Sequence, residues 1–585
     1  MRRPRMMAAV ALLAASTALL TGCTSTKGGG GTTTSSGTSN AAFGAAINNV
    51  VNPSTKQGGT LKLLAQGDCE SWDPARTYLG WCWNMQRLVS RGLVGFSKVN
   101  GSKPEIVGDL ATSLGKHNAD FTEWTYTLRP GIKFSTGKAI TPQDVKYGIE
   151  RIFATDVING GPASYYLTQI AHPKNYLGPY KSGDLNTITT TSDSITFKLS
   201  SPFADFDYLM ALPAASPVPY KTEGGTGYVG ATYGKKPVAS GPFVISSYTQ
   251  NKSVTFVRNK YWTQSSDPIR KPLAKEIDLT IDSSPADIDQ KLKSGTYDAK
   301  MDIDIGSALQ TSVLTNANLK KNADDAPTPF NRFFTIYPSV IPNQHCRAAI
   351  EYATNKAAIL QAFGGPLHGT IAGSVTPITI PGHDASAALY PSGPKGTGDV
   401  AKAKQELQAC GKPNGFSVKF AYSTPSETGP KVFQAEQTAL ARVGITITST
   451  TSASSNYYTT FVGSPRNVKN QGIGISIYGW GADFPTGYGF WQAIANGNAI
   501  LETGNANQPS LNDPKVNAIL KNSLAGKATD ADFRTLDDQV MKNAVYLPIF
   551  FGKTLWYRNP RLTNITCDNA LGFGAYDVVN VGVSG

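Results

Sequence analysis

Short strand-like and helix-like segments alternate along most of this chain, and the alternation limits the fold more than any other feature. Trp124–Leu128 alternates apolar and polar side chains like a strand, and Arg129-Pro130-Gly131 predicts a turn after it. Thr141-Pro142-Gln143-Asp144 predicts a helix start, because threonine caps well, proline suits the first helical position and an acid suits the third. Alternation of this kind predicts an α/β protein in which helices are layered on sheets.

The N-terminal segment is typical of an exported lipoprotein. Arginines near the start precede an apolar run from Met6 to Leu20. The run has about 15 residues and is too short for a membrane-spanning helix, which needs about 20. The run ends in Leu20-Thr21-Gly22-Cys23, which is similar to the lipobox of bacterial lipoproteins. We therefore expect residues 1–22 to be a signal peptide and Cys23 to carry lipid. The alternative is an ordinary secretory signal with a chance cysteine.

The length and composition of the remaining chain indicate several globular domains behind a tether. The 585 residues, less the 22 of the signal, are too many for one core, so two or three domains are expected. Residues 24–57 are mostly small and polar until Val50 and Val51, which predicts a disordered tether over 23–57 behind the lipidated cysteine. The net charge of +13 is scattered without a basic arm, so no nucleic-acid partner is expected.

The cysteines suggest one local disulfide. Cys69 and Cys82 are close in sequence and are the best candidate pair, which an oxidising exterior permits and which would contribute about 3 kcal/mol through loop closure. Five cysteines follow Cys23, so at least one is unpaired or pairs elsewhere. The absence of a CxxC motif argues against a zinc ribbon. The other three are Cys346, Cys410 and Cys567.

An ordered series of motifs extends over about residues 58–580. Its members are Trp124–Ile152, Ser240–Phe243 with Val257–Trp262, Leu292–Asp298, Arg347–Ala353, Ala401–Leu407 with Gly411–Phe416, Tyr478–Pro485 and Tyr546–Phe550. The series resembles that of the family-five extracellular solute-binding proteins, the peptide and oligopeptide receptors of ABC importers. Departures from the family pattern at Ser90-Arg91, Ser135-Thr136 and Asn355-Lys356 bear on ligand identity more than on fold.

The resemblance implies a two-lobed periplasmic-binding-protein-like α/β fold of class II, or cluster C, with a hinge between the lobes. Lobe one is expected to comprise residues 58–325 and 548–585. An extra subdomain is expected inside it at about 86–220. Lobe two is expected to comprise residues 326–547.

The resemblance also implies a ligand site without catalytic residues, metal or cofactor. In peptide receptors of this family the aspartate that matches Asp483 pairs with the ligand's α-ammonium; helix capping is the alternative role. Trp480 and Gly481 would contact the ligand beside it, and core packing is the alternative for Trp480. Glu70 and Trp72 are further candidates for the cleft, with a structural role as their alternative.

Enzyme motifs are mostly absent. No two histidines stand four residues apart, and no GxSxG or Walker A motif occurs. Ser113-Leu114-Gly115-Lys116 spells SxxK, but the KTG motif that supports it in penicillin-binding proteins is missing. Together with the lipobox, the family resemblance implies a monomeric lipid-anchored receptor that delivers di- to oligopeptides to an ABC permease and its ATPase. The alternatives are a receptor for an oligosaccharide or metal chelate, an exported hydrolase, and a sensing or adhesive surface lipoprotein.

Overall fold

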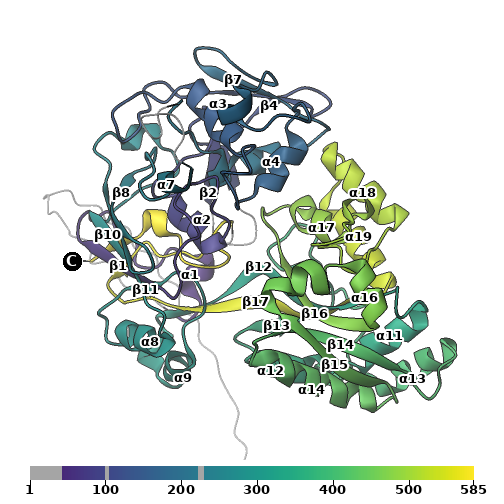
Figure 1. Ribbon diagram of the computed structural model, residues 1–585. Coiled ribbons are helices and arrows are strands. Elements are labelled where there is room, and N and C mark those ends of the chain that lie inside the picture. Colours follow the sequence, from purple (N-terminus) through teal and green to yellow (C-terminus); the bar gives the residue numbers. More distant parts are fainter. Residues whose placement is uncertain (1–41, 99–104, 222–229, 569, 585) are drawn as a thin grey trace, which may run out of the picture. The chain divides into compact units, whose positions relative to one another are not determined.

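The computed structural model describes residues 42–98, 105–221, 230–568 and 570–584. The predicted signal peptide, Cys23 and the tether as far as residue 41 lie outside the described residues. The described residues all fall in one compact unit, in which two larger sheets are linked by the long strands β12 (Ala323–Ile336) and β17 (Tyr546–Tyr557) (Figure 1).

The first sheet, the core of lobe one, has the strand order β11-β1-β10-β9-β8. Strand β1 lies parallel to both of its neighbours, and β9 and β8 continue the sheet antiparallel. Successive side chains of a strand point to opposite faces, so Leu63 packs with the C-terminal segment near Val581 whereas Leu64 packs under the helices α8 and α9. The strands and these helices are β1 (Thr60–Ala65), β8 (Phe243–Thr249), β9 (Ser253–Arg258), β10 (Glu276–Ile281), β11 (Ala299–Lys300), α8 (Pro285–Lys293) and α9 (Ser307–Thr315).

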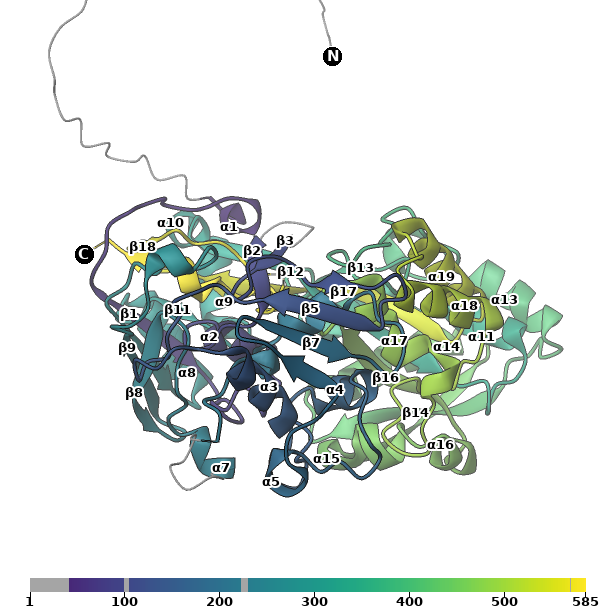
Figure 2. The same cartoon turned by 90° about the horizontal axis from the view of Figure 1, so that it is seen from above.

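A smaller sheet of order β4-β5-β7-β6 forms the core of the expected subdomain (Figure 2). Helix α3 (Pro142–Arg151) packs against it, and the predicted helix start is confirmed: the Asp144 carboxylate accepts from the Thr141 N–H at 2.8 Å and from its hydroxyl at 2.6 Å. Val145 and Ile149 are fully buried on the predicted apolar face. The other elements are β4 (Lys116–His117), β5 (Glu123–Thr127), β6 (Ile188–Thr190), β7 (Ser194–Lys198), α4 (Ala163–Gln169), α5 (Pro179–Ser182) and α6 (Phe206–Met210).

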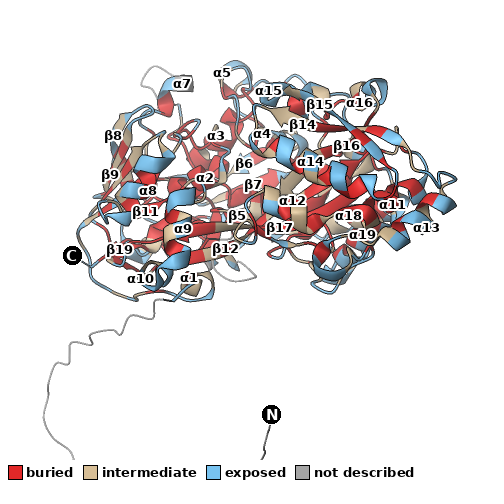
Figure 3. Ribbon diagram, turned by 90° about the horizontal axis from the view of Figure 1, so that it is seen from below, coloured by how far each residue is buried: buried red, intermediate tan, exposed pale blue. Residues whose placement is uncertain are grey.

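The second sheet, the core of lobe two, has the strand order β13-β17-β12-β16-β14-β15. Its central strands are largely buried, whereas the outward faces of its helices are exposed (Figure 3). Strands β14 and β15 run parallel, as the helix α14 between them requires. The elements are β13 (Gly369–Ile371), β14 (Ser417–Thr424), β15 (Thr446–Ala453), β16 (Ile473–Gly481), α11 (Gln344–Ala353), α12 (Lys356–Ala362), α13 (Val400–Ala409), α14 (Thr428–Ala441), α15 (Ser454–Asn456), α16 (Pro465–Gln471), α17 (Gly487–Ala495), α18 (Pro514–Leu524) and α19 (Asp530–Lys542).

Strands β12 and β17 belong to both lobes. At one end Ala323 pairs with Tyr557, and both pack with the first sheet. At the other end Phe334 pairs with Leu547 in the core of the second sheet. The predicted boundaries near residues 325 and 548 fall within these two strands and stay predictions. The remaining elements are α2 (Gly80–Gln86), α7 (Gly230–Tyr233), α10 (Ala317–Lys320), β2 (Val94–Lys98), β3 (Glu105–Gly108), β18 (Leu562–Thr563) and β19 (Gly582–Val583).

The expectation of a disordered tether is wrong for residues 42–57. Helix α1 (Ala45–Asn48) buries Ala46, whose N–H donates to the Asp324 carboxylate at 2.9 Å. Val51 is also fully buried and forms a bridge with Ile565. The partners lie hundreds of residues later in the sequence, so local composition does not predict these contacts.

Two disulfides join the described cysteines. Cys69, in the loop after β1, is bonded to Cys82 in α2, the pair favoured by their spacing. Cys346 of α11 is bonded to Cys410 at the end of α13. Cys567 is buried and takes part in no disulfide with a described residue.

Candidate ligand-binding site

Asp483 lies two residues beyond the end of β16, where lobe two meets lobe one. The β16 register places Gly481 opposite Phe330 of β12, and the N–H of Ala482 continues the pairing by donating to the carbonyl of Pro329 at 3.1 Å. This geometry turns the Asp483 carboxylate towards lobe one. The Tyr78 hydroxyl donates to its two oxygens at 3.0 and 3.1 Å, and the Tyr165 hydroxyl of α4 also donates to it.

The Asp483 carboxylate is nearly buried and has no cation beside it. Asp483 as a whole is 9% exposed. Among the described residues no lysine, arginine or histidine lies within ion-pair distance of its carboxylate. Burial raises the pKa of Asp483 to about 6, although the two phenol hydrogen bonds act in the opposite direction. The site therefore holds a carboxylate whose negative charge the surrounding chain does not neutralise.

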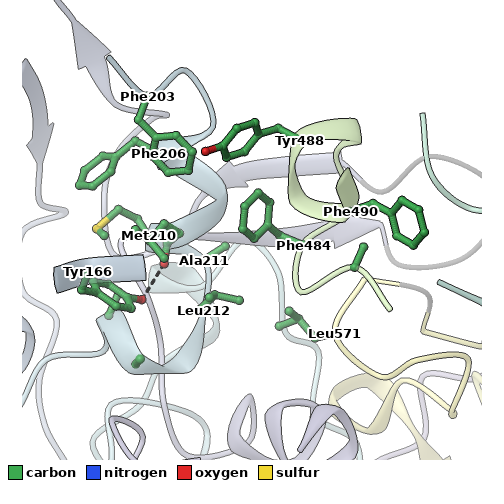
Figure 4. Packing of buried hydrophobic residues seen from close by; sticks show 14 of the residues in the cluster. Tyr166, Phe203, Phe206, Met210, Ala211, Leu212, Phe484, Tyr488, Phe490 and Leu571 are labelled. Carbon is green, nitrogen blue, oxygen red and sulfur yellow. Dashed lines mark hydrogen bonds between the residues drawn. The ribbon is translucent and has the colours of Figure 1, made fainter. Parts of the chain in front are cut away.

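Helix capping does not account for Asp483. Thr486 caps α17, because its side chain accepts from the N–H of Gly489 at 2.9 Å, and its hydroxyl donates to Asp205 at 2.6 Å. The next residue after Asp483, Phe484, is fully buried and lies near Tyr488 and Phe203 (Figure 4). Its ring centroid is 6.4 Å from that of Phe203 and the two rings meet edge to face. The aspartate is thus held at a packed contact between the lobes.

Trp480 and Gly481 lie beside this contact. Trp480 pairs with Asn331 across the sheet, is partly buried, and packs against the core formed by the subdomain and lobe two. Its indole Nε1 is buried without a hydrogen-bond partner among the described residues. A Cβ on Gly481 would lie 2.9 Å from the Phe330 ring and 3.2 Å from the Phe573 ring, so glycine leaves room between these aromatic side chains.

Glu70 and Trp72 have different surroundings. Glu70 is exposed and accepts from the N–H of Leu79, which precedes α2, at 3.1 Å. Trp72 is fully buried in lobe one, where its ring meets that of Phe256 edge to face at 5.3 Å. The structure brings Asp483, Trp480 and Gly481 together, whereas the Trp72 ring offers no surface to a ligand in this conformation.

A cavity of about 630 Å³ opens beside the two linking strands. Lobe one contributes residues that follow β1 and β11 and the start of α2, and β12 and β17 contribute aromatic and charged side chains. The cavity combines a large apolar surface with a few polar groups, as small-molecule sites commonly do. The lining includes Asp68, Leu79, Trp81, Asp302, Asp304, Phe330, Arg332, Phe363, His368, Phe550, Lys553 and Phe573.

Tyr78, Tyr165 and Arg332 are not among the site residues predicted from the sequence. Tyr78 and Tyr165 are separated from Asp483 by 405 and 318 residues, and no local pattern marks either of them. Arg332 could have been noticed, because an arginine inside the apolar strand Phe330–Ile336 needs a partner or a function.

Two lobes joined by paired strands, with a cavity beside those strands, place the chain in the class of two-lobed solute-binding proteins. Residues 105–501 match the family described as "Bacterial extracellular solute-binding proteins, family 5 Middle", and the chain belongs to this family. Membership confirms the predicted fold class. It also confirms that the chain is a binding protein and not an enzyme, because the family consists of solute-binding proteins.

Similar proteins cover three quarters of the chain or more. The Probable D,D-dipeptide-binding periplasmic protein DdpA of Escherichia coli (strain K12) is 27% identical over 513 residues, which is 84% of this chain and 88% of that protein. The Glutathione-binding protein GsiB of Pectobacterium atrosepticum is 27% identical over 460 residues, covering 76% and 79%. The solved Clavulanic acid biosynthesis oligopeptide binding protein 2 is 35% identical with a TM-score of 0.87, covering 94% and 99%.

The described residues show neither a metal cluster nor a membrane-spanning helix. Within the ranges that the structure covers, no three histidine, cysteine or acidic side chains gather as metal ligands would. Across the same ranges, the helices are too short or too polar to cross a bilayer.

Proposed function

We propose that this chain is the lipid-anchored receptor of a peptide ABC importer, which captures di- to oligopeptides between its lobes. The observation that carries the proposal is the buried Asp483 carboxylate, which has no cationic partner among the described residues. A peptide's α-ammonium would supply the missing positive charge. A hydrogen bond between charged groups away from water contributes about 1.5–3 kcal/mol, enough to select ligands with a free amino terminus.

The similar proteins support peptides as the ligand class. Those reported above are named for a D,D-dipeptide, for glutathione and for oligopeptides. These ligands share an amino group and amide bonds but differ in length and side chains. Recognition of the shared groups, with water in the side-chain pockets, would accommodate such a range.

The two-lobed fold supports a transport cycle in which the lobes close on the ligand. A ligand that contacts both lobes stabilises the closed form by its differential affinity for that form, and no covalent step is needed. The closed receptor, as a monomer, would then dock on the permease subunits and their ATPase. Lipid on Cys23 would keep it at the outer face of the cytoplasmic membrane throughout.

The role of Asp483 is tested by calorimetry with Ala-Ala-Ala and its N-acetylated form. We expect the unmodified protein to bind the free amine about 10- to 100-fold more tightly, and Asp483→Asn to lose this preference, because the amide carries no charge to pair with the ammonium. Equal affinities in the unmodified protein would overturn the proposed contact. Binding of an oligosaccharide or metal chelate, with no di- to hexapeptide bound, would favour the rival receptor role.

The anchor is tested separately by growing producing cells with radiolabelled palmitate. We expect label on the unmodified protein and none on Cys23→Ala, which should be released into the medium because it has no acyl chain. Label retained by the variant would refute Cys23 as the lipidated residue.

A further inference from the structure

The subdomain of lobe one and the helical part of lobe two are joined by direct contacts outside the linking strands. The N–H of Ala204, in the segment before α6, donates to the carbonyl of Leu524 at the end of α18 at 2.9 Å. A Cβ on Gly526, just after α18, would lie 2.8 Å from the Phe121 ring of the subdomain, so the two segments approach closely. Because these residues belong to different lobes, parting the lobes breaks both contacts.

Each side of this contact contributes a carboxylate. Asp205, which precedes α6 in the subdomain, accepts from the Thr486 hydroxyl of lobe two at 2.6 Å. Asp483 of lobe two accepts from the hydroxyls of Tyr78 and Tyr165, which both belong to lobe one. The arrangement is reciprocal, because each carboxylate takes its hydrogen bonds from the opposite lobe.

Neither carboxylate has a cation to offset its charge. Within the ranges that the structure covers, no lysine, arginine or histidine lies within ion-pair distance of Asp205 or Asp483. Lys527, in the segment after α18, and His117, beside the Phe121 ring, are both exposed and form no ion pair with either acid. Closing the lobes therefore places two acids between protein segments that do not neutralise them.

The titratable groups that face Asp205 are phenols and one acid. The phenols are those of Tyr208 on α6 and Tyr488 on α17, and the charge of Asp205 raises the pKa of both, although burial is the larger cause. Asp207 lies two residues further along the chain and is directed into lobe one, where it accepts from the Tyr126 hydroxyl at 2.8 Å. None of these groups supplies a positive charge to Asp205.

Burial between the lobes opposes the charged form of both acids. It raises the pKa of Asp205 to about 6, as it does that of Asp483, although the hydroxyl hydrogen bonds act in the opposite direction. When the lobes part, water reaches the carboxylates, and their pKa returns towards the ordinary value of about 3.9. The closed form thus binds protons that the open form releases. It gains free energy as pH falls through about 6, and the gain is complete below about pH 4.

We propose that Asp205 and Asp483 are an acid-sensitive lock between the lobes, in which protonation of either carboxylate makes opening of the receptor rarer. Acid would then slow the entry and release of any solute, because both steps need the lobes to part. The inference concerns the movement of the lobes and does not depend on which solute the protein binds.

Hydrogen exchange at the Ala204 amide measures the opening directly. This N–H bonds to Leu524 of the other lobe, so it exchanges when the lobes part, and its protection factor reports the ratio of closed to open protein. The full mature protein is measured without peptide at pH 7.5 and pH 5, with rates normalised to an unstructured peptide. We expect protection to rise about tenfold for each carboxylate, or about 100-fold in total, on going to pH 5.

The two acids are tested separately and together. Asp205→Asn and Asp483→Asn keep an oxygen that accepts from the opposite lobe's hydroxyls but cannot titrate. Each should reduce the rise in Ala204 protection to about tenfold, and the double variant should reduce it to less than threefold. Amides of β10, the central strand of the first sheet, report global unfolding and should stay more protected than Ala204 in every variant.

Asp207→Asn is the matched control. Asp207 is also buried, and burial raises its pKa, but its hydrogen-bond partners Tyr126 and Gly115 belong to its own lobe. The control should keep the full rise of about 100-fold. A rise of less than threefold in the unmodified protein, or a rise in the double variant as large as in the unmodified protein, overturns the inference. Because no peptide is present, either result leaves the proposed peptide function untouched.

Discussion

At the scale of single residues, the properties of Asp483 come from groups far away in the sequence. The hydroxyls of Tyr78 and Tyr165 hold the carboxylate, and both come from lobe one. Phenols stabilise the negative charge less than an ammonium would, so the pKa stays raised at about 6. The ligand-free protein thus holds a carboxylate that is partly protonated in mildly acidic solution.

This raised pKa predicts that peptide affinity falls in acid. A ligand ammonium lowers the pKa of Asp483 by pairing with the charged form, so binding below pH 6 has to release a proton. Peptide affinity is therefore highest above about pH 6 and decreases as the pH falls below this value. At pH 5 it should be about tenfold lower. The peptide's amino group, with an ordinary pKa near 7.7–8.0, is fully charged near pH 5 and still mostly charged at pH 7.5.

Calorimetry at pH 7.5 and pH 5, in buffers of different ionisation enthalpy, measures both the affinity and the proton release. Asp483→Asn should show weak affinity with little change between the two pH values. A fall in affinity that is equally large in the variant would assign the effect to another group.

Some site residues could be predicted from the sequence and others could not. Asp483 could be predicted as a candidate because its motif, Tyr478–Pro485, is contiguous and resembles that of a family. Trp72, singled out from a local turn, is a core residue of lobe one in this structure. Tyr78 and Tyr165 act through contacts between distant segments, and such contacts leave no trace in local spacing. Arg332, in contrast, stands out as a charged residue inside an apolar strand.

At the scale of elements, helices α11, α12 and α14 enclose a charged cluster. Glu436 of α14 accepts from the Thr354 hydroxyl at 2.8 Å, but its other oxygen is buried without a partner among the described residues. Glu351 of α11 is also fully buried, and Lys356 of α12 donates to the carbonyl of Ala372 at 3.0 Å. Burial raises the pKa of Glu351 and lowers that of Lys356, because each loses hydration in its charged form.

The cluster predicts that Glu436→Gln removes part of the pH dependence of folding. Burial raises the pKa of Glu436 to about 8, above its ordinary value of about 4.3 when unfolded. The folded state therefore binds a proton that the unfolded state releases. The contribution of this proton to the free energy of unfolding is lost as pH rises towards 8. We expect the unmodified protein to lose about 1–3 kcal/mol more than Glu436→Gln between pH 5.5 and pH 8.

Denaturant unfolding at the two pH values measures the difference. Glu502→Gln changes an exposed acid and should behave like the unmodified protein. If Glu436→Gln also loses stability to the same extent as the unmodified protein, another group causes the effect.

At the scale of the whole molecule, the architecture could be predicted because the motifs recur in a known order. Alternating elements favoured an α/β fold, and the family resemblance supplied the two lobes and the inserted subdomain. Local capping chemistry correctly located the start of α3. Residues 42–57 and the disulfide between Cys346 and Cys410 escaped prediction, since each depends on tertiary partners that composition does not reveal.

The packing of Phe484 makes a prediction about lobe closure. Its ring, from lobe two, lies 5.7 Å from that of Tyr165 and 6.3 Å from that of Tyr208, both in the subdomain of lobe one. Phe484→Ala removes a contact that exists only when the lobes meet, so it raises the free energy of the closed form. Every ligand then has less closed receptor available, and affinity should fall about tenfold for all peptides alike.

This uniform loss separates closure from ligand contact. Asp483→Asn should leave the affinity for the N-acetylated peptide unchanged, whereas Phe484→Ala should weaken the binding of free, acetylated and amidated peptides equally. X-ray scattering of the ligand-free Phe484→Ala variant should also give a larger radius of gyration than that of the unmodified protein. Phe420→Ala is the control, because Phe420 is buried wholly within lobe two, against Phe334. It should lower stability but leave affinity unchanged well below the unfolding temperature. Unchanged affinity in Phe484→Ala would mean that this aromatic contact does not govern closure.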